Sequence, residues 1–355
     1  MSMQYEFLEN VCDILDSQRI PVTAVDRKAG PYPYYGANGV QDYVADYIFD
    51  DELVLLAEDG GNFGSKDKPI AYRVSGKCWV NNHAHVLKPK NCIDIDYFCY
   101  SIKFYDTSRL VNGATRQKLT QAAMRKMLIP MREIEIQRGI AVKIGRIEYL
   151  IQKRKDQLNR IDDLVKSQFI EMFGGGQYPE CPVKEFVAGK VESVRRRYKP
   201  KDQIRYVDIS SIDNKLNQMT GFTEYTLKDA PSRAQQCIER GDILVSTVRP
   251  NLRNIAMNTF DDDRMVASSG FCVLRATSCE RNYLFVALLL DNFSRKMSEL
   301  TTGANYPAIK DSDILEYRIP KPPIDRQIAF ARFVEQSDKS KVLMEKSQKI
   351  VQMLI

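Results

Sequence analysis

The two histidines of the chain, His83 and His85, are the first candidates for chemistry. One residue separates them, so on a β-strand both side chains would point to the same face, as two ligands of one metal ion require. Cys78 and Cys92 lie not far away, but no neighbouring carboxylate or thiol completes a recognisable ligand set. No Ser/His/Asp or Cys/His pattern for nucleophilic catalysis accompanies them. We therefore expect a structural histidine pair, no metal centre and no catalytic residue.

Two glycine-rich stretches could be taken for cofactor loops. Residues 60–68 faintly resemble a phosphate-binding loop, but the glycine spacing is too short and Asp67 follows Lys66. Residues 174–176 follow a predicted helix rather than a strand, which favours a helix end and hinge over the glycine loop of a methyltransferase. The sequence also lacks the Asn/Asp-Pro-Pro-Tyr/Phe motif of adenine methylation. We expect no cofactor bound by this chain.

The eight cysteines are scattered, and none forms a Cys-x-x-Cys pair. This arrangement is typical of reduced, mostly buried thiols in a cytoplasmic protein. The first residues show no secretory signal pattern, and no apolar run approaches the length of a membrane span. A cytoplasmic location without a membrane partner is therefore expected.

Two segments of the chain, residues 113–141 and 303–331, are copies of one another. Residues of the same or similar type recur 190 positions apart without a gap, and the matched pairs are Gly113/Gly303, Leu119/Ile309, Ile129/Ile319, Pro130/Pro320, Ile134/Ile324, Gln137/Gln327 and Ala141/Ala331. A period this long indicates two copies of one module rather than a solenoid. The strand-rich segments that precede the two copies do not repeat, so two unlike domains joined by shared linkers are expected.

Each copy of the repeat ends in a predicted long helix. Over residues 133–172 apolar side chains alternate at spacings of four and three, as in a heptad seam, with Arg154 as the only gap. The seam consists of Ile140, Ile144, Ile147, Ile151, Leu158, Ile161 and Val165. The second helix, residues 324–355, has a weaker stripe that contains Phe330, Val334, Met344 and Val351. A helix of forty residues is roughly 60 Å long, more than one small domain can cover. We expect the two helices to pair as an antiparallel coiled coil that separates the domains.

The expected fold class is α+β with a pseudo-two-fold internal repeat. Short apolar runs between turn signals predict strand-rich domains over residues 1–111 and 178–301, and residues 112–177 and 302–355 would each hold a linker and a long helix. Residues 112–166 contain thirteen Lys/Arg and six Asp/Glu, a local net charge of +7, whereas the net charge of the whole chain is +6. On charge alone, this stretch is either a nucleic-acid footprint or a solvated helix surface.

These features resemble the specificity (S) subunit of type I restriction-modification systems, over nearly the whole chain. The most typical stretch is residues 302–327, TGANYPAIKDSDILEYRIPKPPIDRQ. Residues 33–40 and 80–86 resemble one class of target-recognition domain, and residues 205–213 and 241–250 resemble another. The first linker departs from the pattern at residues 116–118 and after Pro130.

This resemblance implies a division of labour. Each target-recognition domain would read one half of a split, asymmetric sequence in double-stranded DNA, and the coiled coil would set the spacer. Two modification (M) subunits would bring adenine-N6 methyltransferase chemistry with S-adenosylmethionine, and restriction (R) subunits would add ATP- and Mg-dependent translocation and cleavage. The chain itself would be non-catalytic. A self-contained DNA-modifying enzyme and a coiled-coil assembly protein without a DNA role are the alternatives.

Within this resemblance, loops that combine basic, amide and aromatic side chains are the candidates for DNA contacts. In the first domain the candidates are Tyr34, Tyr35, Asn38, Asn62, Lys66 and Lys68. In the second domain they are Arg195, Arg196, Arg197, Tyr198, Lys201, Arg249, Asn251 and Arg253. For each single residue, solvated loop charge stays an alternative to a DNA contact.

Overall fold

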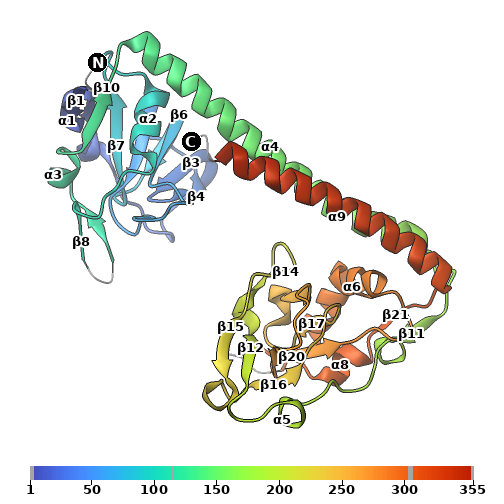
Figure 1. The fold of residues 1–355 in the computed structure, drawn as a ribbon. Helices are drawn as coiled ribbons and strands as arrows, with labels where there is room; N and C mark the ends of the chain where they lie inside the picture. Colours follow the sequence, from blue (N-terminus) through green and yellow to red (C-terminus); the bar gives the residue numbers. More distant parts are fainter. Residues whose placement is uncertain (1–3, 114–115, 303–306, 353–355) are drawn as a thin grey trace. The chain divides into compact units, whose positions relative to one another are not determined.

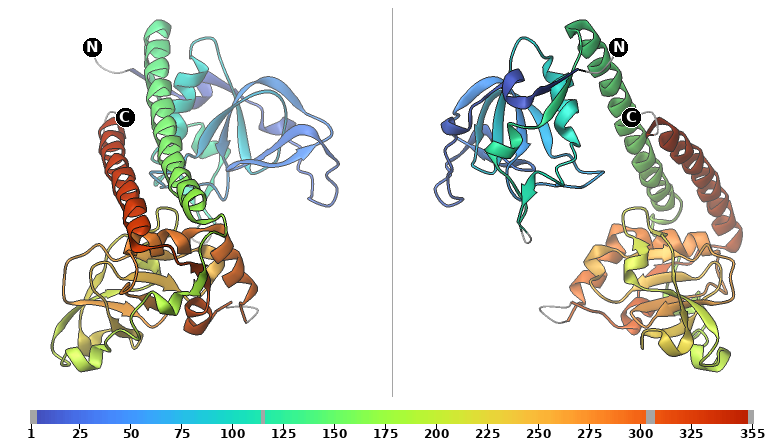
Figure 2. Two further views of the ribbon diagram at one scale, coloured as in Figure 1. Left: turned by 90° about the vertical axis from the view of Figure 1, so that its right-hand side faces the viewer. Right: turned by 60° about the vertical axis from the view of Figure 1, so that its left-hand side comes forward.

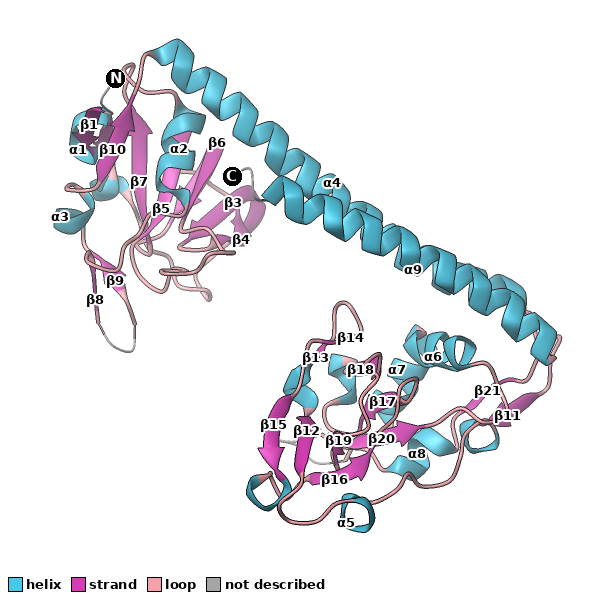
Figure 3. Ribbon diagram, viewed as in Figure 1, coloured by secondary structure: helices cyan, strands magenta, loops and turns pink. Residues whose placement is uncertain are grey.

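The computed structural model describes residues 4–113, 116–302 and 307–352, with the backbone alone for 345–352. The chain folds as two compact units, Met1–Ile151 and Gln152–Leu354. Both units mix strands and helices, as the sequence predicts (Figure 3). Among the described residues, no helix combines the length and the apolar character that a membrane span needs.

A six-stranded sheet with the order β2-β7-β5-β6-β3-β4 forms the centre of the first unit (Figure 1). Neighbouring strands are antiparallel, except that β3 and β6 are parallel. Residues 53–57 are fully buried, which suits the interior position of β5. The strands are β2 (Cys12–Ile14), β3 (Ala29–Gly36), β4 (Gly39–Val44), β5 (Phe49–Ala57), β6 (Ala71–Val80) and β7 (Ala84–Pro89).

Helix α2 (Ile95–Lys103) packs against this sheet and begins at a well-formed cap. The carboxylate of Asp94 accepts hydrogen bonds from the backbone nitrogens of Asp96 and Tyr97, at 3.1 and 3.0 Å. The shorter elements of this unit are β1 (Gln4–Phe7), α1 (Leu8–Val11), η1 (Asp16–Gln18), β8 (Val111–Asn112), β9 (Lys118–Leu119), α3 (Gln121–Met124) and β10 (Leu128–Met131).

The second unit contains two larger sheets that pack on each other. One has the order β15-β12-β19-β16 and the other β13-β14-β18-β17-β20. Side chains of both sheets share one buried cluster, which includes Val207, Leu244, Ala256, Met265 and Phe271. The strands are β12 (Gln203–Val207), β13 (Ile212–Asp213), β14 (Gln218–Met219), β15 (Thr223–Thr226), β16 (Ala234–Cys237), β17 (Ile243–Ser246), β18 (Ile255–Met257), β19 (Met265–Ser268) and β20 (Phe271–Leu274).

Two helices follow the last strand of the five-stranded sheet. The chain becomes extended at Leu290 (φ −69°, ψ 149°), which ends α6 (Arg281–Leu289) before α7 (Asp291–Glu299) begins. The remaining short elements are β11 (Glu180–Pro182), η2 (Val183–Glu185), α5 (Val194–Arg197), η3 (Ile209–Ser211), η4 (Leu227–Asp229), η5 (Pro250–Leu252), α8 (Asp311–Leu315) and β21 (Arg318–Pro320).

The two long helices that the sequence predicts are present as α4 (Ile134–Phe173) and α9 (Ile324–Gln352). Within the second unit, α9 lies beside the C-terminal part of α4 (Figures 1 and 2). Phe330 packs against Phe169, and Lys341 forms an ion pair with Asp162. Because the residue numbers rise on one helix and fall on the other, the two helices are antiparallel over this stretch.

The predicted seam of α4 serves more than one neighbour. Ile140 packs on the core of the first unit, whereas Val165 is buried in the core of the second. The other seam residues on α4 are half-buried, namely Ile144, Ile147, Ile151, Leu158 and Ile161. On α9, Phe330 and Val334 are buried and Met344 is half-buried, while the Val351 side chain lies outside the described residues.

Contacts between each domain and its linker repeat at the level of single backbone bonds. In the first unit, the nitrogen of Leu8 donates to the carbonyl of Met127 at 2.9 Å. In the second, the nitrogen of Val183 donates to the carbonyl of Tyr317 at 2.8 Å. Met127 and Tyr317 are 190 residues apart, so the sequence repeat corresponds to a repeated structural framework.

Candidate nucleic-acid interface

Two loops that hold many of the candidate residues start at equivalent points of the two domains. One loop follows β5 and the other follows β17. The nitrogen of Gly60 donates to the carbonyl of Gln117 at 3.3 Å, and the nitrogen of Arg249 donates to the carbonyl of Pro307 at 2.8 Å. Gly60 and Arg249 both have left-handed backbones, with φ of 61° and 50°. The repeated linker therefore holds the base of a polar loop in each domain.

In the second domain this loop is a tight turn bounded by two left-handed arginines. The short helix η5 lies between Arg249 and Arg253, whose φ angles are 50° and 55°. A left-handed backbone is uncommon for residues other than glycine, so local bonds have to hold it. The Arg253 guanidinium supplies two such bonds, from Nε to Ser294 Oγ at 3.1 Å and from Nη1 to Asp291 Oδ1 at 2.7 Å. Arg253 is thus an anchor of the turn on α7, while Arg249 and Asn251 are exposed.

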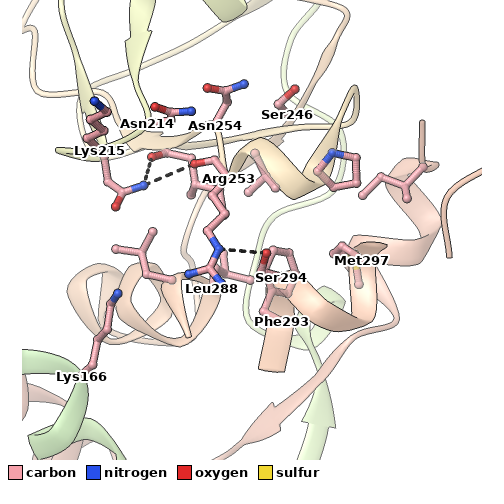
Figure 4. Close-up of a pocket in the computed structure, with 16 residues that line it drawn as sticks. Lys166, Asn214, Lys215, Ser246, Arg253, Asn254, Leu288, Phe293, Ser294 and Met297 are labelled. Carbon is pink, nitrogen blue, oxygen red and sulfur yellow. Dashed lines mark hydrogen bonds between the residues drawn. The ribbon is translucent and has the colours of Figure 1, made fainter. Parts of the chain in front are cut away.

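A cavity of about 190 Å³ lies beside this turn. The amides of Asn214 and Asn254 lie on one side of it, and the apolar side chains of Leu288, Phe293 and Met297 lie on the other (Figure 4). Asn214 Nδ2 donates to the carbonyl of Leu252 at 2.8 Å, which ties the β13–β14 hairpin to the turn.

The same hairpin supplies residues that sequence reasoning missed. Asn217, itself left-handed with φ of 51°, donates from Nδ2 to the carbonyls of Arg253 and Ile255, at 3.4 and 3.2 Å. Lys215 lines the cavity next to it. The run Asp-Asn-Lys-Leu-Asn at residues 213–217 is a turn signal in the sequence. The bonds from this turn to the carbonyls of Arg253 and Ile255 could not be predicted from the sequence and are found only in the structure.

The basic cluster of the second domain forms one helical turn, α5. Val194 is buried at 3% exposure and fixes the turn to the domain, while Arg195 and Arg196 are exposed. Arg197 is held by ion pairs with Glu192 at 2.8 Å and Glu239 at 3.5 Å. The hydrogen bond to Glu192 raises the pKa of the Arg197 guanidinium further above its usual range. Arg195 and Arg196 are therefore the better placed of the three for phosphate contacts.

A groove of about 700 Å³ runs beside α5 and is lined by Arg195, Tyr198, Lys228, Ser232 and Gln235 among others. The Tyr198 hydroxyl donates to the carbonyl of Asp263, and burial raises the pKa of this phenol. Tyr198 therefore keeps its proton and forms a fixed wall of the groove. Lys201 is exposed.

In the first domain, the candidate loop is organised by its own amides. Asn62 Nδ2 donates to the carbonyl of Pro69 at 3.3 Å and closes the loop, and Asn38 Nδ2 donates to the carbonyl of Gly60 at 3.0 Å. Lys66 and Lys68 are exposed, and neither forms an ion pair with any residue in the described part of the chain. This loop therefore offers two positive charges beside a fixed turn.

The structure removes Tyr34 from the candidate contacts. Its side chain is 1% exposed, its hydroxyl bonds with the backbone of Val22, and the Arg27 guanidinium lies 4.1 Å from its ring centroid. The expectation of a DNA contact is wrong for this residue because alternation along β3 turns it into the core. Tyr35 is half-buried and its ring packs against Tyr72, with centroids 5.8 Å apart.

The two histidines do not share a strand face. His83 lies in the turn before β7 and contacts Asp59, with Nδ1 and Oδ1 2.7 Å apart. His85 lies within β7 and is fully buried. Its Nδ1 is 2.6 Å from Asp16 Oδ2, and its Nε2 is 2.9 Å from the carbonyl of Leu119. His85 therefore joins the domain to its linker.

Asp16, Glu58 and His85 bring ligand-type atoms within 4.8 Å of one another, but neighbouring cations already balance the carboxylates. Arg19 lies 2.6 Å and Lys118 3.0 Å from Glu58. Burial raises the pKa of both carboxyls, but hydrogen bonds outweigh it. Bonds from His85, Val86 and Gln121 hold the pKa of Asp16 below the usual carboxyl range, and bonds from Arg19 and Lys118 do the same for Glu58. The cluster is a polar connection between the domain and its linker.

Comparison with known proteins identifies the family. A family model described as the type I restriction modification DNA specificity domain matches residues 2–161 and 188–353. The chain belongs to this family. The resemblance found in the sequence is thereby confirmed, and the two matched segments place one specificity domain in each half of the chain.

Individual relatives of the type I specificity family agree. The putative type I restriction enzyme specificity subunit S.HindORF215P of Haemophilus influenzae is 35% identical over 142 residues, which are 40% of this chain and 36% of that protein. The type I restriction enzyme MjaVIII specificity subunit of Methanocaldococcus jannaschii is 22% identical over 94% of this chain and 88% of that protein.

A solved structure shares the fold of the whole chain. The S subunit of a type I restriction-modification system from M. genitalium matches 100% of this chain and 94% of its own, with a TM-score of 0.57 and 12% identity. The mixed α/β architecture with two specificity repeats and two long helices is therefore a fold known for this family.

Proposed function

We propose that this chain reads DNA sequence for a type I restriction-modification complex, with one half of a split, asymmetric target bound by each strand-rich domain. One observation carries the proposal. The same linker contacts hold two unlike domains, one built on a six-stranded sheet and the other on a four- and a five-stranded sheet. Unlike domains present unlike loops to a groove, which suits two different half-sites better than a palindrome.

In this proposal α4 and α9 form an antiparallel coiled coil that sets the spacer between the half-sites. The contacts of Phe169 with Phe330 and of Lys341 with Asp162 support such pairing over part of its length. At about 1.5 Å per residue, the forty residues of α4 span roughly 60 Å. Equivalent major-groove faces recur about every 34–36 Å, so a spacer of this size suits two separated half-sites.

The partners that we propose are double-stranded DNA, two M subunits and R subunits. The linker repeat supports two identical partners, because it offers two copies of one framework. Chemistry would reside on those subunits, with S-adenosylmethionine, ATP and Mg bound there, and this chain would be non-catalytic. The loops with Asn62, Lys66 and Lys68, with Arg195 and Arg196, and with Arg249 and Asn251 are the proposed DNA contacts.

Three experiments test this proposal. Methylated adenines mapped in the host genome, with the gene present and deleted, should define one split, non-palindromic motif. In gel shifts, the chain reconstituted with M subunits should then prefer that motif over duplexes with either half scrambled. Binding without preference for any split sequence would refute the recognition role. Methyl transfer by the purified chain without M subunits would instead support a self-contained enzyme.

A further inference from the structure

A buried glutamine joins the first spacer helix to the first domain. Gln137 lies one turn into α4 and is 0% exposed. Its Oε1 accepts a hydrogen bond from the backbone nitrogen of Asp94 at 2.8 Å. Its Nε2 donates to the carbonyls of Arg132 at 2.8 Å and Cys92 at 3.2 Å. Since Asp94 is the cap of α2, Gln137 connects the beginning of the domain helix to the beginning of the spacer helix.

The second copy repeats this arrangement. Gln327 lies one turn into α9 and is 2% exposed. Its Oε1 accepts from the backbone nitrogen of Glu280 at 2.9 Å, and its Nε2 donates to the carbonyl of Pro322 at 2.9 Å. Glu280 caps α6 by accepting from the backbone nitrogen of Tyr283 at 3.0 Å. Each glutamine thus bonds to a helix cap and to the carbonyl five residues before itself.

A tyrosine reinforces each glutamine. Three residues after the cap, Tyr97 donates from its hydroxyl to the carbonyl of Pro130 at 3.0 Å, and Tyr283 donates to the carbonyl of Pro320 at 2.5 Å. Burial raises the pKa of both phenols, so both keep the proton that they donate. Pro130 and Pro320 lie on the short strands that lead into the spacer helices. The sequence signature is an acidic residue with tyrosine three positions later, repeated 186 residues apart.

We propose that Gln137 with Tyr97, and Gln327 with Tyr283, are positioning residues that fix the direction of each spacer helix on its own recognition domain. A glutamine amide suits this role because it donates and accepts at once, and hydrogen bonds are directional where apolar packing allows sliding. The inference rests on the proposed function, since the two helices can set the spacing between half-sites only if each is joined rigidly to its recognition domain. Loss of these bonds should widen the accepted spacers and leave base preference unchanged.

The test uses the chain reconstituted with M subunits and duplexes in which the mapped spacer is native, or shorter or longer by one or two base pairs. Gln137→Met and Gln327→Met remove all the amide bonds at similar side-chain volume. Tyr97→Phe and Tyr283→Phe remove one hydroxyl each. These milder variants test the same joints if the buried methionine prevents folding. Gln152→Met and Gln336→Met, at exposed positions of the same two helices, are the matched controls.

We expect the preference for the native spacer to fall roughly tenfold in the methionine variants and less in the phenylalanine variants, in keeping with the loss of a few hydrogen bonds. Backbone hydrogen exchange at Asp94 or Glu280 should speed up in the variant that affects it, and the controls should match wild type. An unchanged spacer profile, or a loss of base preference at the half-site, would overturn this inference alone. A wild-type complex without any spacer preference would overturn the proposed function as well.

Discussion

Phe169 of α4 and Phe330 of α9 pack edge to face, with ring centroids 5.4 Å apart and ring planes at 82°. Tyr283 of α6 stacks on Phe169 at 5.2 Å, and Phe173 meets Phe330 at 5.6 Å. Four aromatic rings therefore join both long helices to the second recognition domain. Rigid aromatic rings that bury large areas are well suited to hold the two long helices at a constant angle to this domain.

Phe169→Ala should destabilise the second unit strongly. The side chain is 2% exposed, and truncating a buried phenylalanine costs about 3–5 kcal/mol of unfolding free energy. Urea unfolding followed by far-UV circular dichroism measures this loss. Ile170→Ala is the control, because Ile170 is the next residue of the helix and is 56% exposed. Equal losses in the two variants would show that the aromatic contacts of Phe169 do not contribute the expected stability, since alanine has a higher helix propensity than either residue it replaces.

Asp16→Asn should lower stability in a pH-dependent manner. Burial disfavours the charged carboxylate, but bonds from His85, Val86 and Gln121 outweigh it and keep the pKa of Asp16 low. The folded pKa thus lies below the unfolded value of about 4, so this contribution is complete above that value and is lost as pH falls through the folded pKa.

We therefore expect Asp16→Asn to cost roughly 1–3 kcal/mol at neutral pH and progressively less below about pH 4. Urea midpoints of wild type and variant between pH 7 and pH 3 check this. The control is Asp13→Asn, at an exposed position of the same segment. A difference between wild type and Asp16→Asn that stays constant over the whole pH range would contradict the assigned cause.

Arg249→Ala and Arg253→Ala should both impair only the second half-site, for different reasons. Arg249 is exposed at the turn, so its loss should reduce discrimination at that half-site by roughly tenfold, the scale of one base contact. Arg253 acts through the turn that it anchors on Asp291 and Ser294, so its loss should also speed amide exchange across residues 250–253.

The measurement compares binding to duplexes with either half-site scrambled. Arg240→Ala, an exposed arginine of the same unit that pairs with Asp261 at 3.7 Å, is the charge-matched control. Equal loss at both half-sites would point to general electrostatic attraction rather than to local reading.

Deleting one heptad, residues 153–159, from α4 should shift or abolish the spacer preference. Seven helical residues correspond to about 10 Å, close to the rise of three base pairs. Genome-wide adenine methylation in a strain that carries the shortened chain shows the new spacing, or no methylation if the complex fails to form. The same spacing as wild type would rule out α4 as the ruler.

Several features were predictable because they depend on local pattern. The long helices α4 and α9 follow from their length and from the spacing of apolar residues, and the family follows from the repeated linker. The signature of an acidic cap followed by tyrosine was also present in the sequence. Its meaning depended on Gln137 and Gln327, which lie more than forty residues further along the chain.

Individual site residues were less predictable because exposure and pairing are tertiary properties. Tyr34 and Tyr35 are neighbours of the same type, yet the alternation of β3 buries the first and half-exposes the second. Arg195 and Arg197 belong to one basic run, yet only Arg197 meets Glu192 and Glu239.

The sequence by itself determined that this chain holds two unlike domains, each followed by a copy of the same linker and helix. Repeats and heptads can be recognised from the spacing of residues along the chain alone. Only the tertiary structure decided which polar side chains support the fold and which are exposed. Gln137, Gln327, Arg253 and His85 all bond to groups distant in sequence, and directional bonds of this kind form only after packing has brought their partners together.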